Sequence, residues 1–554
     1  MDKYANVLAV LMLVAMFGLM LASSWNDSAI FDEVAHIGAG YTYLKYLDGR
    51  LNPEHPPLLK SMAALPLLFL SASGRIKENI AAQPFWTMEN VNDRQWATGN
   101  YLLYEAGNDA DRILFWSRLP MILLTILFGW ILFSWVKKRY GAAVGLLTLF
   151  FFAVSPTFLA HGRYVTTDVG AALGFFLGII FFLRFLERQD LKSATWLGVV
   201  LGLVLLFKFS LVLLLPIYLI ILIFKNWNLI ENWKLKIRNL ALATIIALAV
   251  IYAAYIPQIW GYPHDQQMKD ARYILAGYQY PSLAKLDFWL TEQTLTRPLG
   301  LYLQGFLMVA RRTAGGNTAY FMGEISSKGW WSYFPVLAIT KEQLGFYILA
   351  IIALFTAIKN RARPDFNSLA AIIFIIFYWA SSILNPLNIG VRHVLPTFPF
   401  LYFLVAKGLI SGRPTSYGRR TSIYLISTWM IIETLFAFPY YLSYYNILGG
   451  GEENGYKIAT DSNYDWGQDL KRLTFWVKEN NLDKIYLDYF GGGSPKYYLG
   501  DKFEPWWPAK GAPPRESYFA ISINSLAGSE NLYPWLKSKN LAARAGSSIL
   551  IYRF

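Results

Sequence analysis

The sequence predicts a polytopic α-helical membrane protein of about eleven spans, with a small C-terminal α/β domain outside the membrane. Of its 554 residues, 55% are AVILMFWYC residues and only 16% are charged, against about 25% in an ordinary soluble domain. The mean hydropathy is +0.33, and apolar runs of membrane-spanning length recur along the chain. These observations argue against the string of soluble domains that the length alone would suggest.

The spans follow from these apolar runs, with a break at Lys208 that divides the long run 194–224 into two. Residues 5–24 could be a signal peptide, but their length and the later spans favour an uncleaved first span. The predicted spans are 5–24, 112–136, 141–160, 165–186, 194–207, 209–224, 239–258, 342–358, 368–384, 395–411 and 421–442.

The net charge of +14 reflects topology, because Lys and Arg cluster in short loops between these spans. With eleven spans, Lys3 and five basic clusters fall on one face, which the positive-inside rule makes cytoplasmic. The clusters lie at 137–139, 188–192, 225–238, 359–363 and 413–420. We therefore expect a multi-pass protein of the plasma (inner) membrane with a cytoplasmic N-terminus, and no nucleic-acid partner. Because the chain has no cysteine, thiol catalysis and thiolate metal sites are excluded.

Two regions follow from this topology: a transmembrane region 1–442 with long outer loops 25–111 and 259–341, and an extracytoplasmic α/β domain 443–554. In the tail, we predict a helix at 467–480 and strands at 485–487, 517–523 and 547–553. The segment DSNYDWGQD at 461–469 begins like a calcium loop but lacks its glycine and final glutamate, which favours a turn and helix cap.

Acidic residues mark the outer boundary of the predicted membrane region. Asp32 and Glu33 follow the first span directly, and adjacent carboxylates there are typical of a functional cavity. Asp32 could instead cap a helix at 33–46, and Glu33 could be a solvated surface acid. Asp168 begins a later span, where it could also be a cap, and we expect the three carboxylates to converge at one depth.

A proline-rich turn and several basic residues lie on the same side. The motif NPEHPPLLK at 52–60 holds Glu54 and His55 in an extended turn, and the apolar stretch 57–70 lies in the membrane interface or forms a buried loop helix. Lys208 interrupts an apolar run, and Arg392 and His393 stand at the mouth of a later span. Such cations would be satisfied by a phosphate, by an internal carboxylate or by snorkelling.

Together these motifs resemble the GT-C superfamily of polyprenyl-phosphate-sugar-dependent glycosyltransferases, with protein O-mannosyltransferases and lipid A aminoarabinose transferases as the nearest relatives. Asp32 and Glu33 look like its acidic motif, and Asp168 matches the acid of its second outer turn. A Pro-Pro-Leu motif follows His55, where the aminoarabinose transferases have a lysine. The stretches 320–335 and 388–400 also look like those of bacterial members.

The resemblance implies an inverting transfer from a polyprenyl-phosphate sugar to a hydroxyl of a protein, lipid or glycan outside the membrane. Asp32 would be the general base, and Glu33 and Asp168, the other two catalytic residues, would position the acceptor or sugar. The implied substrate-binding residues are Glu54, His55, Arg163, Lys208, Arg392 and His393. The residue chemistry agrees, because a hydroxyl nucleophile needs a base whereas a phosphate leaving group needs cations.

Other functions stay open at this point. A transporter or flippase of lipid-linked sugar would explain the many spans and Lys208, although no inverted repeat is present. An envelope assembly component would leave the paired acids unexplained. Asp32, Glu33, Asp168 and histidines could ligate a metal, but the resemblance does not require one, so we expect no metal and no cofactor.

Overall fold

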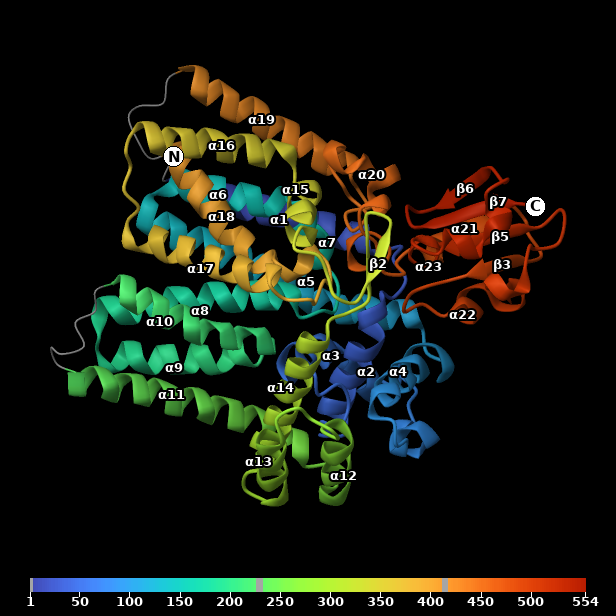
Figure 1. Cartoon of the computed structure of the whole chain (residues 1–554), viewed down its shortest axis with the longest axis horizontal. Helices are drawn as coiled ribbons and strands as arrows, with labels where there is room; N and C mark the ends of the chain where they lie inside the picture. Colours follow the sequence, from blue (N-terminus) through green and yellow to red (C-terminus); the bar gives the residue numbers. More distant parts are fainter. Residues whose placement is uncertain (1–2, 226–232, 411–416) are drawn as a thin grey trace.

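The computed structural model describes residues 3–225, 233–410 and 417–554. This part of the chain is mostly helical, as predicted, and has two small sheets. The apolar helices run side by side in a bundle, and the larger sheet lies beyond one end of it (Figure 1).

The bundle has a helix at each of the eleven predicted spans, with two consecutive helices, α6 and α7, at 141–160. Its helices are α1 (Ala5–Ser24), α5 (Ala110–Tyr140), α6 (Ala142–Val154), α7 (Pro156–His161), α8 (Asp168–Arg188), α9 (Leu191–Leu205), α10 (Leu214–Phe224), α11 (Trp233–Tyr255), α16 (Leu344–Lys359), α17 (Phe366–Ile383), α18 (Phe398–Ile410) and α19 (Tyr417–Phe436).

Length and hydropathy qualify only some of these helices as spans on their own. Within the described ranges, five helices are long and apolar enough to cross a membrane. A sixth span results if α15 (Tyr333–Lys341) and α16, which are bent by 104° at a short break, are counted together. The remaining apolar helices have 10–17 residues, so the count of eleven spans stays a prediction.

Local sequence explains where key helices begin and end. Asp109 caps α5, since its side chain accepts a hydrogen bond from the backbone N–H of Arg112 at 3.1 Å. Gly141 ends α5 with φ of 90°, a conformation that a β-carbon would strain. Lys208 lies between α9 and α10, so the run 194–224 forms two helices with the lysine at their turn.

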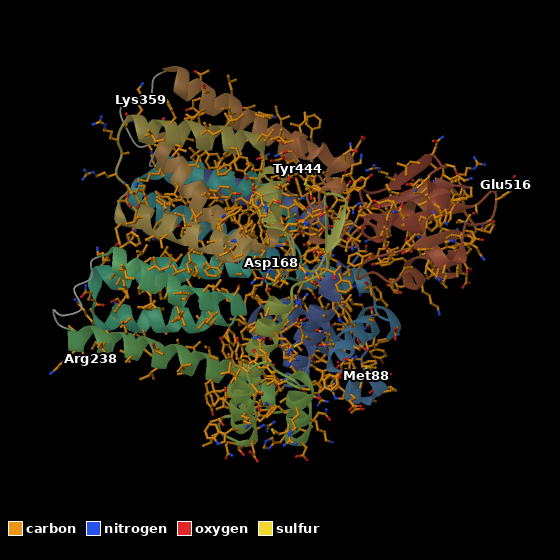
Figure 2. The ribbon with its side chains drawn as sticks, in the orientation of Figure 1. Met88, Asp168, Arg238, Lys359, Tyr444 and Glu516 are labelled. Carbon is orange, nitrogen blue, oxygen red and sulfur yellow. The ribbon has the colours of Figure 1, made fainter. Side chains whose placement is uncertain are left out.

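Basic residues gather at the end of the bundle opposite the C-terminal sheet. Arg238 and Lys359 lie at that far end, whereas Asp168 lies deep in the molecule at the other end of the helices (Figure 2). This arrangement agrees with the predicted topology, although the orientation in a membrane stays a prediction. In the fifth basic cluster, Arg413 lies outside the described residues.

The loops predicted to be extracytoplasmic are largely helical and cover the same end of the bundle as Asp168. They form α2 (Phe31–Lys45), α3 (Pro57–Ala72), α4 (Val91–Asn100), α12 (His264–Ile274), α13 (Pro281–Glu292) and α14 (Arg297–Gly315), and a hairpin of β1 (Ala319–Phe321) and β2 (Glu324–Ser326). Helix α2 packs between α3 and α4 and is almost entirely buried. One face of α3 is buried, while its Leu65 and Phe69 are exposed.

The C-terminal region is built around a five-stranded sheet of order β4-β3-β5-β7-β6. Strand β3 runs parallel to β4 and β5, whereas β7 runs antiparallel to β5 and β6. The elements are α20 (Gly451–Asn454), α21 (Leu470–Glu479), β3 (Ile485–Asp488), α22 (Pro495–Leu499), β4 (Phe503–Pro505), β5 (Tyr518–Ser522), α23 (Ile523–Leu526), β6 (Leu541–Ala545) and β7 (Ile549–Arg553). The predicted helix and three strands are present, and β4 and β6 are additional edge strands.

Candidate active site

Two acids and two basic residues from distant parts of the sequence meet where the bundle faces the C-terminal region. Asp32, in the first turn of α2, accepts a hydrogen bond through Oδ2 from Arg392 Nη1 at 2.9 Å. Asp168, the first residue of α8, contacts the same Arg392 atom at 3.4 Å and Lys208 Nζ at 2.7 Å. Because both Asp168 oxygens hold a cation, this acid fixes the positions of Lys208 and Arg392.

Asp32 is the more accessible of the two acids. Its side chain is 24% exposed, whereas that of Asp168 is 2% exposed. The N-cap of α2 is Ile30 rather than Asp32, so the structure gives Asp32 no capping role. Asp32 is therefore the carboxylate of this cluster that an external group could reach.

Residues of the C-terminal region hold the start of α2 in place. The backbone N–H groups of Ser28 and Phe31 donate hydrogen bonds to the carbonyls of Gln468 and Trp466, both at 3.0 Å. The Trp466 ring lies under the Arg392 guanidinium, with 4.2 Å from Cζ to the ring centroid. The tail thus contacts Arg392 and Phe31, the residue before Asp32.

The loop that carries Arg392 is held by Ser462 and Asn463 of the C-terminal region. Val391 N–H donates to Asn463 Oδ1 at 2.9 Å, and Ser462 Oγ donates to the Ile389 carbonyl at 2.9 Å. Gly390 has φ of 101°, and a β-carbon there would stand 2.4 Å from Ser462 Oγ. A glycine is required at 390 for the two segments to approach this closely.

Two cavities meet at the Asp32–Arg392 pair. The first, which we call the membrane-side cavity, has a volume of about 150 Å³ and is also lined by His55, Asp168 and Lys208. The second, the tail-side cavity, has a volume of about 330 Å³ and is lined by residues of the C-terminal region, among them Asp461 and Trp466. Asp32 and Arg392 line both cavities, whereas Lys208 lines only the first.

Each cavity is lined by a buried polar atom that finds no hydrogen-bond partner within the described residues. In the membrane-side cavity these atoms are His55 Nδ1 and Ser210 Oγ. In the tail-side cavity it is the Asn388 side chain, whose Oδ1 accepts from Trp330 N–H while its Nδ2 donor has no partner. Buried polar groups are ordinarily paired, so an unpaired atom on a residue that lines each cavity is unusual.

The proline-rich turn contributes to the membrane-side cavity as expected for Glu54 and His55. Glu54 pairs with Arg312 of α14 at 3.0 Å. The buried Lys60 holds the turn, because its Nζ donates to the carbonyls of Asn52 and His55, both at 2.7 Å. Burial lowers the pKa of His55 well below its usual range, and the nearby charge of Lys60 acts in the same direction, so the imidazole is neutral at neutral pH.

Glu33 lies outside both cavities, unlike its neighbour Asp32. Its fully buried carboxylate receives two hydrogen bonds from Arg118, from Nε at 2.9 Å and Nη2 at 2.7 Å. It also accepts the backbone N–H groups of Ile30 and Val165. Glu33 is therefore not a solvated surface acid, and it ties α2 to the bundle.

Of the remaining predicted residues, one lines a cavity and one is buried away from both cavities. His393 lines the membrane-side cavity, and its ring stacks on Phe334 at 5.3 Å. Arg163 is buried away from both cavities, where it pairs with Asp27 at 3.0 Å. Asp27 also pairs with Arg472 of α21 at 2.8 Å, which links the bundle to the C-terminal region.

Several site residues were not predicted from the sequence. Arg312 was not singled out in the sequence, Asn388 appeared only within the stretch 388–400, and Asp461 and Trp466 belonged to a segment interpreted as a turn and helix cap. Within the described residues, no group of three or more His, Asp or Glu side chains is arranged to hold a metal ion. The expectation that no metal is needed stays a prediction.

Comparisons with known proteins are consistent with this geometry. Residues 112–255 match the family model of dolichyl-phosphate-mannose-protein mannosyltransferases. No curated protein sequence matches the chain. A crystal structure of ArnT from Cupriavidus metallidurans bound to undecaprenyl phosphate superposes with a TM-score of 0.51 at 12% identity, covering 98% of this chain and 97% of that one. The apo structure of the same ArnT gives 0.36 at 11% identity, covering 99% and 98%. Residues 112–255 are therefore similar to a mannosyltransferase family, and the chain as a whole has an ArnT-like fold.

Proposed function

We propose that this chain is an inverting glycosyltransferase that moves a sugar from a polyprenyl-phosphate donor to an acceptor hydroxyl on the extracytoplasmic face of the membrane. The observation that carries the proposal is the position of Asp32 and Arg392, which line both cavities. A base and a phosphate-binding cation at one junction suit a reaction between ligands that arrive from two sides.

The membrane-side cavity is the proposed donor site. Its cations, Lys208 and Arg392, are held 2.7 Å and 3.4 Å from Asp168, so they are in place before a phosphate arrives. Such fixed cations stabilise the charge that grows on a departing phosphate. The ArnT structure that shares this fold contains undecaprenyl phosphate, which supports a polyprenyl-phosphate donor here.

The proposed chemistry is a single displacement at the anomeric carbon. The acceptor oxygen forms the new bond to this carbon while the bond from carbon to phosphate oxygen breaks, and the electron pair leaves with the phosphate. Asp32 takes the proton of the acceptor hydroxyl in the transition state. Lys208 and Arg392 compensate the charge of the polyprenyl phosphate that is released.

The other predicted residues take supporting roles in this proposal. Asp168 positions the two cations, and Glu54, His55 and His393 line the donor site. Glu33 and Arg163 act at a distance, because their pairs with Arg118 and Asp27 fix the elements around the site. The proposal needs no metal, since side-chain cations bind the phosphate.

The test is sugar release and transfer by the purified protein with a panel of radiolabelled undecaprenyl-phosphate hexoses and pentoses. We expect activity that survives EDTA and falls at least 100-fold in Asp32→Asn, as for loss of a general base. Asp265→Asn, which changes an exposed acid on α12, is the matched control. Normal turnover by Asp32→Asn would refute the role of Asp32.

The same preparation tests the alternative of a transporter. If no donor in the panel is cleaved and intact donor crosses liposomes that contain the protein, the enzyme proposal fails. Loss of activity in EDTA that returns with a divalent cation would refute metal independence alone.

A further inference from the structure

We propose that the tail-side cavity binds the acceptor and that this acceptor is an uncharged saccharide, held in part by the C-terminal region. The inference rests on the proposed function and names the substrate class that would reach Asp32 opposite the donor. In an inverting displacement the acceptor enters from the side away from the leaving phosphate. The tail-side cavity meets this condition, because it contains Asp32 but neither Lys208 nor Asp168.

The polar lining of this cavity is richer than one acceptor hydroxyl needs. Hydrogen-bonding side chains reach it from α2, from the two loops around 317 and 388, and from the C-terminal region. These residues are Asp32, Asn317, Asn388, Asp461 and Asn524. A serine or threonine side chain offers a single hydroxyl to these groups. A saccharide offers several hydroxyl groups that both donate and accept.

Asn388 gives the most direct sign of a ligand. Its side chain is 2% exposed, and its Oδ1 is fixed by Trp330 N–H at 2.7 Å. The remaining Nδ2 donor has no partner within the described residues. Because Asn388 lines the tail-side cavity and buried polar groups are ordinarily paired, this donor lacks a partner that a ligand oxygen would supply.

Asp461 is held in the cavity wall by contacts within the C-terminal region. Its backbone has φ of 52°, a conformation that Asp tolerates better than most residues. Asn524 fixes it, because Asn524 Oδ1 accepts from Asp461 N–H at 3.1 Å and Asn524 N–H donates to Asp465 Oδ2 at 2.9 Å. Left-handed backbone outside glycine persists where the surroundings hold it, often at ligand sites.

The charges in the cavity favour an uncharged acceptor. Of the two arginines that line it, Arg312 pairs with Glu54, and Arg392, which contacts Asp32 and Asp168, is taken by the donor phosphate in the proposed function. An acceptor that carried a phosphate or carboxylate would approach Asp32 and Asp461 without a spare cation from these two arginines. Like charges at close range oppose binding.

The size and apolar wall of the cavity also suit a saccharide. Its volume of about 330 Å³ is at the lower end for ligand pockets, about 300–1,000 Å³. Phe31 and Phe490 stack with ring centroids 5.4 Å apart and line the cavity together with Tyr320. Their rings offer the apolar contact that the C–H face of a sugar needs, beside polar groups for its hydroxyls.

The experiment measures transfer from the donor that the release assay identifies. The acceptors are methyl glycosides of glucose, galactose, mannose and N-acetylglucosamine, a glucuronic acid methyl glycoside, and a peptide rich in serine and threonine. The variants are Asn388→Asp, which keeps the acceptor for Trp330 N–H but lacks Nδ2, and Asp461→Asn, which keeps the backbone contact with Asn524. Asn531→Ala changes an exposed asparagine of the same region and is the control.

We expect saturable transfer to at least one neutral glycoside and none to the peptide or the glucuronide. Each cavity variant should raise the KM for the glycoside about 10-fold, while the KM for the donor changes less than twofold. A purely structural defect would instead lower kcat for all substrates together. Transfer to the peptide or glucuronide alone, or an unchanged glycoside KM in both variants, would overturn the inference while the proposed function stands. Absence of donor cleavage would overturn the proposed function itself.

Discussion

Glu33→Ala should lower the stability of the fold, whereas Asp32→Asn should lower activity with little change in stability, although the two residues are adjacent. Glu33 is fully buried and receives two hydrogen bonds from Arg118 and two from backbone N–H groups. Alanine at 33 removes all four acceptor contacts and leaves the Arg118 guanidinium without its carboxylate. Asparagine at 32 keeps an oxygen that can accept from Arg392, and the Asp32 side chain is 24% exposed.

The expected magnitudes differ accordingly. Removing one partner of a buried ion pair costs about 3–5 kcal/mol. Arg118 keeps contacts with the carbonyls of Ser24, Asp27 and Ser28, so we expect Glu33→Ala to stay in this range despite its unpaired amides. This loss is a large part of a typical folding free energy of about 5–15 kcal/mol. Asp32→Asn should cost at most about 1 kcal/mol, as for a partly exposed pair.

The assay compares the temperature at which half of the detergent-solubilised protein stays monodisperse after heating, together with sugar release. Glu33→Ala should melt well below the parent protein, and Glu33→Gln should lie between them because it keeps one acceptor oxygen. Asp32→Asn should melt like the parent and lose activity. Glu33→Ala with a parental melting temperature and a purely catalytic defect would refute the structural role of Glu33.

Three further predictions follow from the site. Lys208→Ala should raise the KM for the donor about 10- to 100-fold, as for a lost charged hydrogen bond. Initial rates test this, with Lys478→Ala, at an exposed lysine, as the control. Equal KM values for the two variants would contradict the prediction. Burial raises the pKa of Asp461 to about 6, although the charge of Arg392 acts to lower that pKa. The KM for the acceptor should therefore rise as the pH falls through 6. A pH profile of this KM should be flatter for Asp461→Asn. The same shift means that the contribution of Asp461 to folding stability is present at low pH and lost as the pH rises through 6. Lys60→Met should lower the melting temperature, since carbonyls in the turn 52–55 lose their donor, and an unchanged melting curve would count against this.

The charged cluster was largely predictable because topology constrains it. Asp32, Asp168, Lys208 and Arg392 each stand beside an apolar run, and the charge bias of the loops predicts that these ends share one face. A charged side chain that faces lipid is costly, so these side chains are expected to point away from lipid and to pair with one another. The structure brings these four residues together.

The different surroundings of Asp32 and Glu33 were not predictable from the sequence. Which acid turns inward depends on Arg118, 85 residues away along the chain, and on the Val165 backbone. Arg163 shows the same limit, because its position beside Asp168 in sequence says nothing of its pair with Asp27. The edge strands β4 and β6 were missed, since FEP and LAARA are short and lack a clear alternating pattern.

The tail-side cavity takes Phe31 and Asp32 from the start of α2, further lining from residues 312–392, and its last wall from residues 460–527. During synthesis, the bundle can insert long before this last wall exists. On the proposed topology, the cavity closes only after most of the C-terminal region has crossed the membrane and docked through contacts such as that between Arg472 and Asp27. The order of translation would therefore delay the proposed transferase activity until the residues up to 527 have been made, because the proposed acceptor site has no complete wall before then.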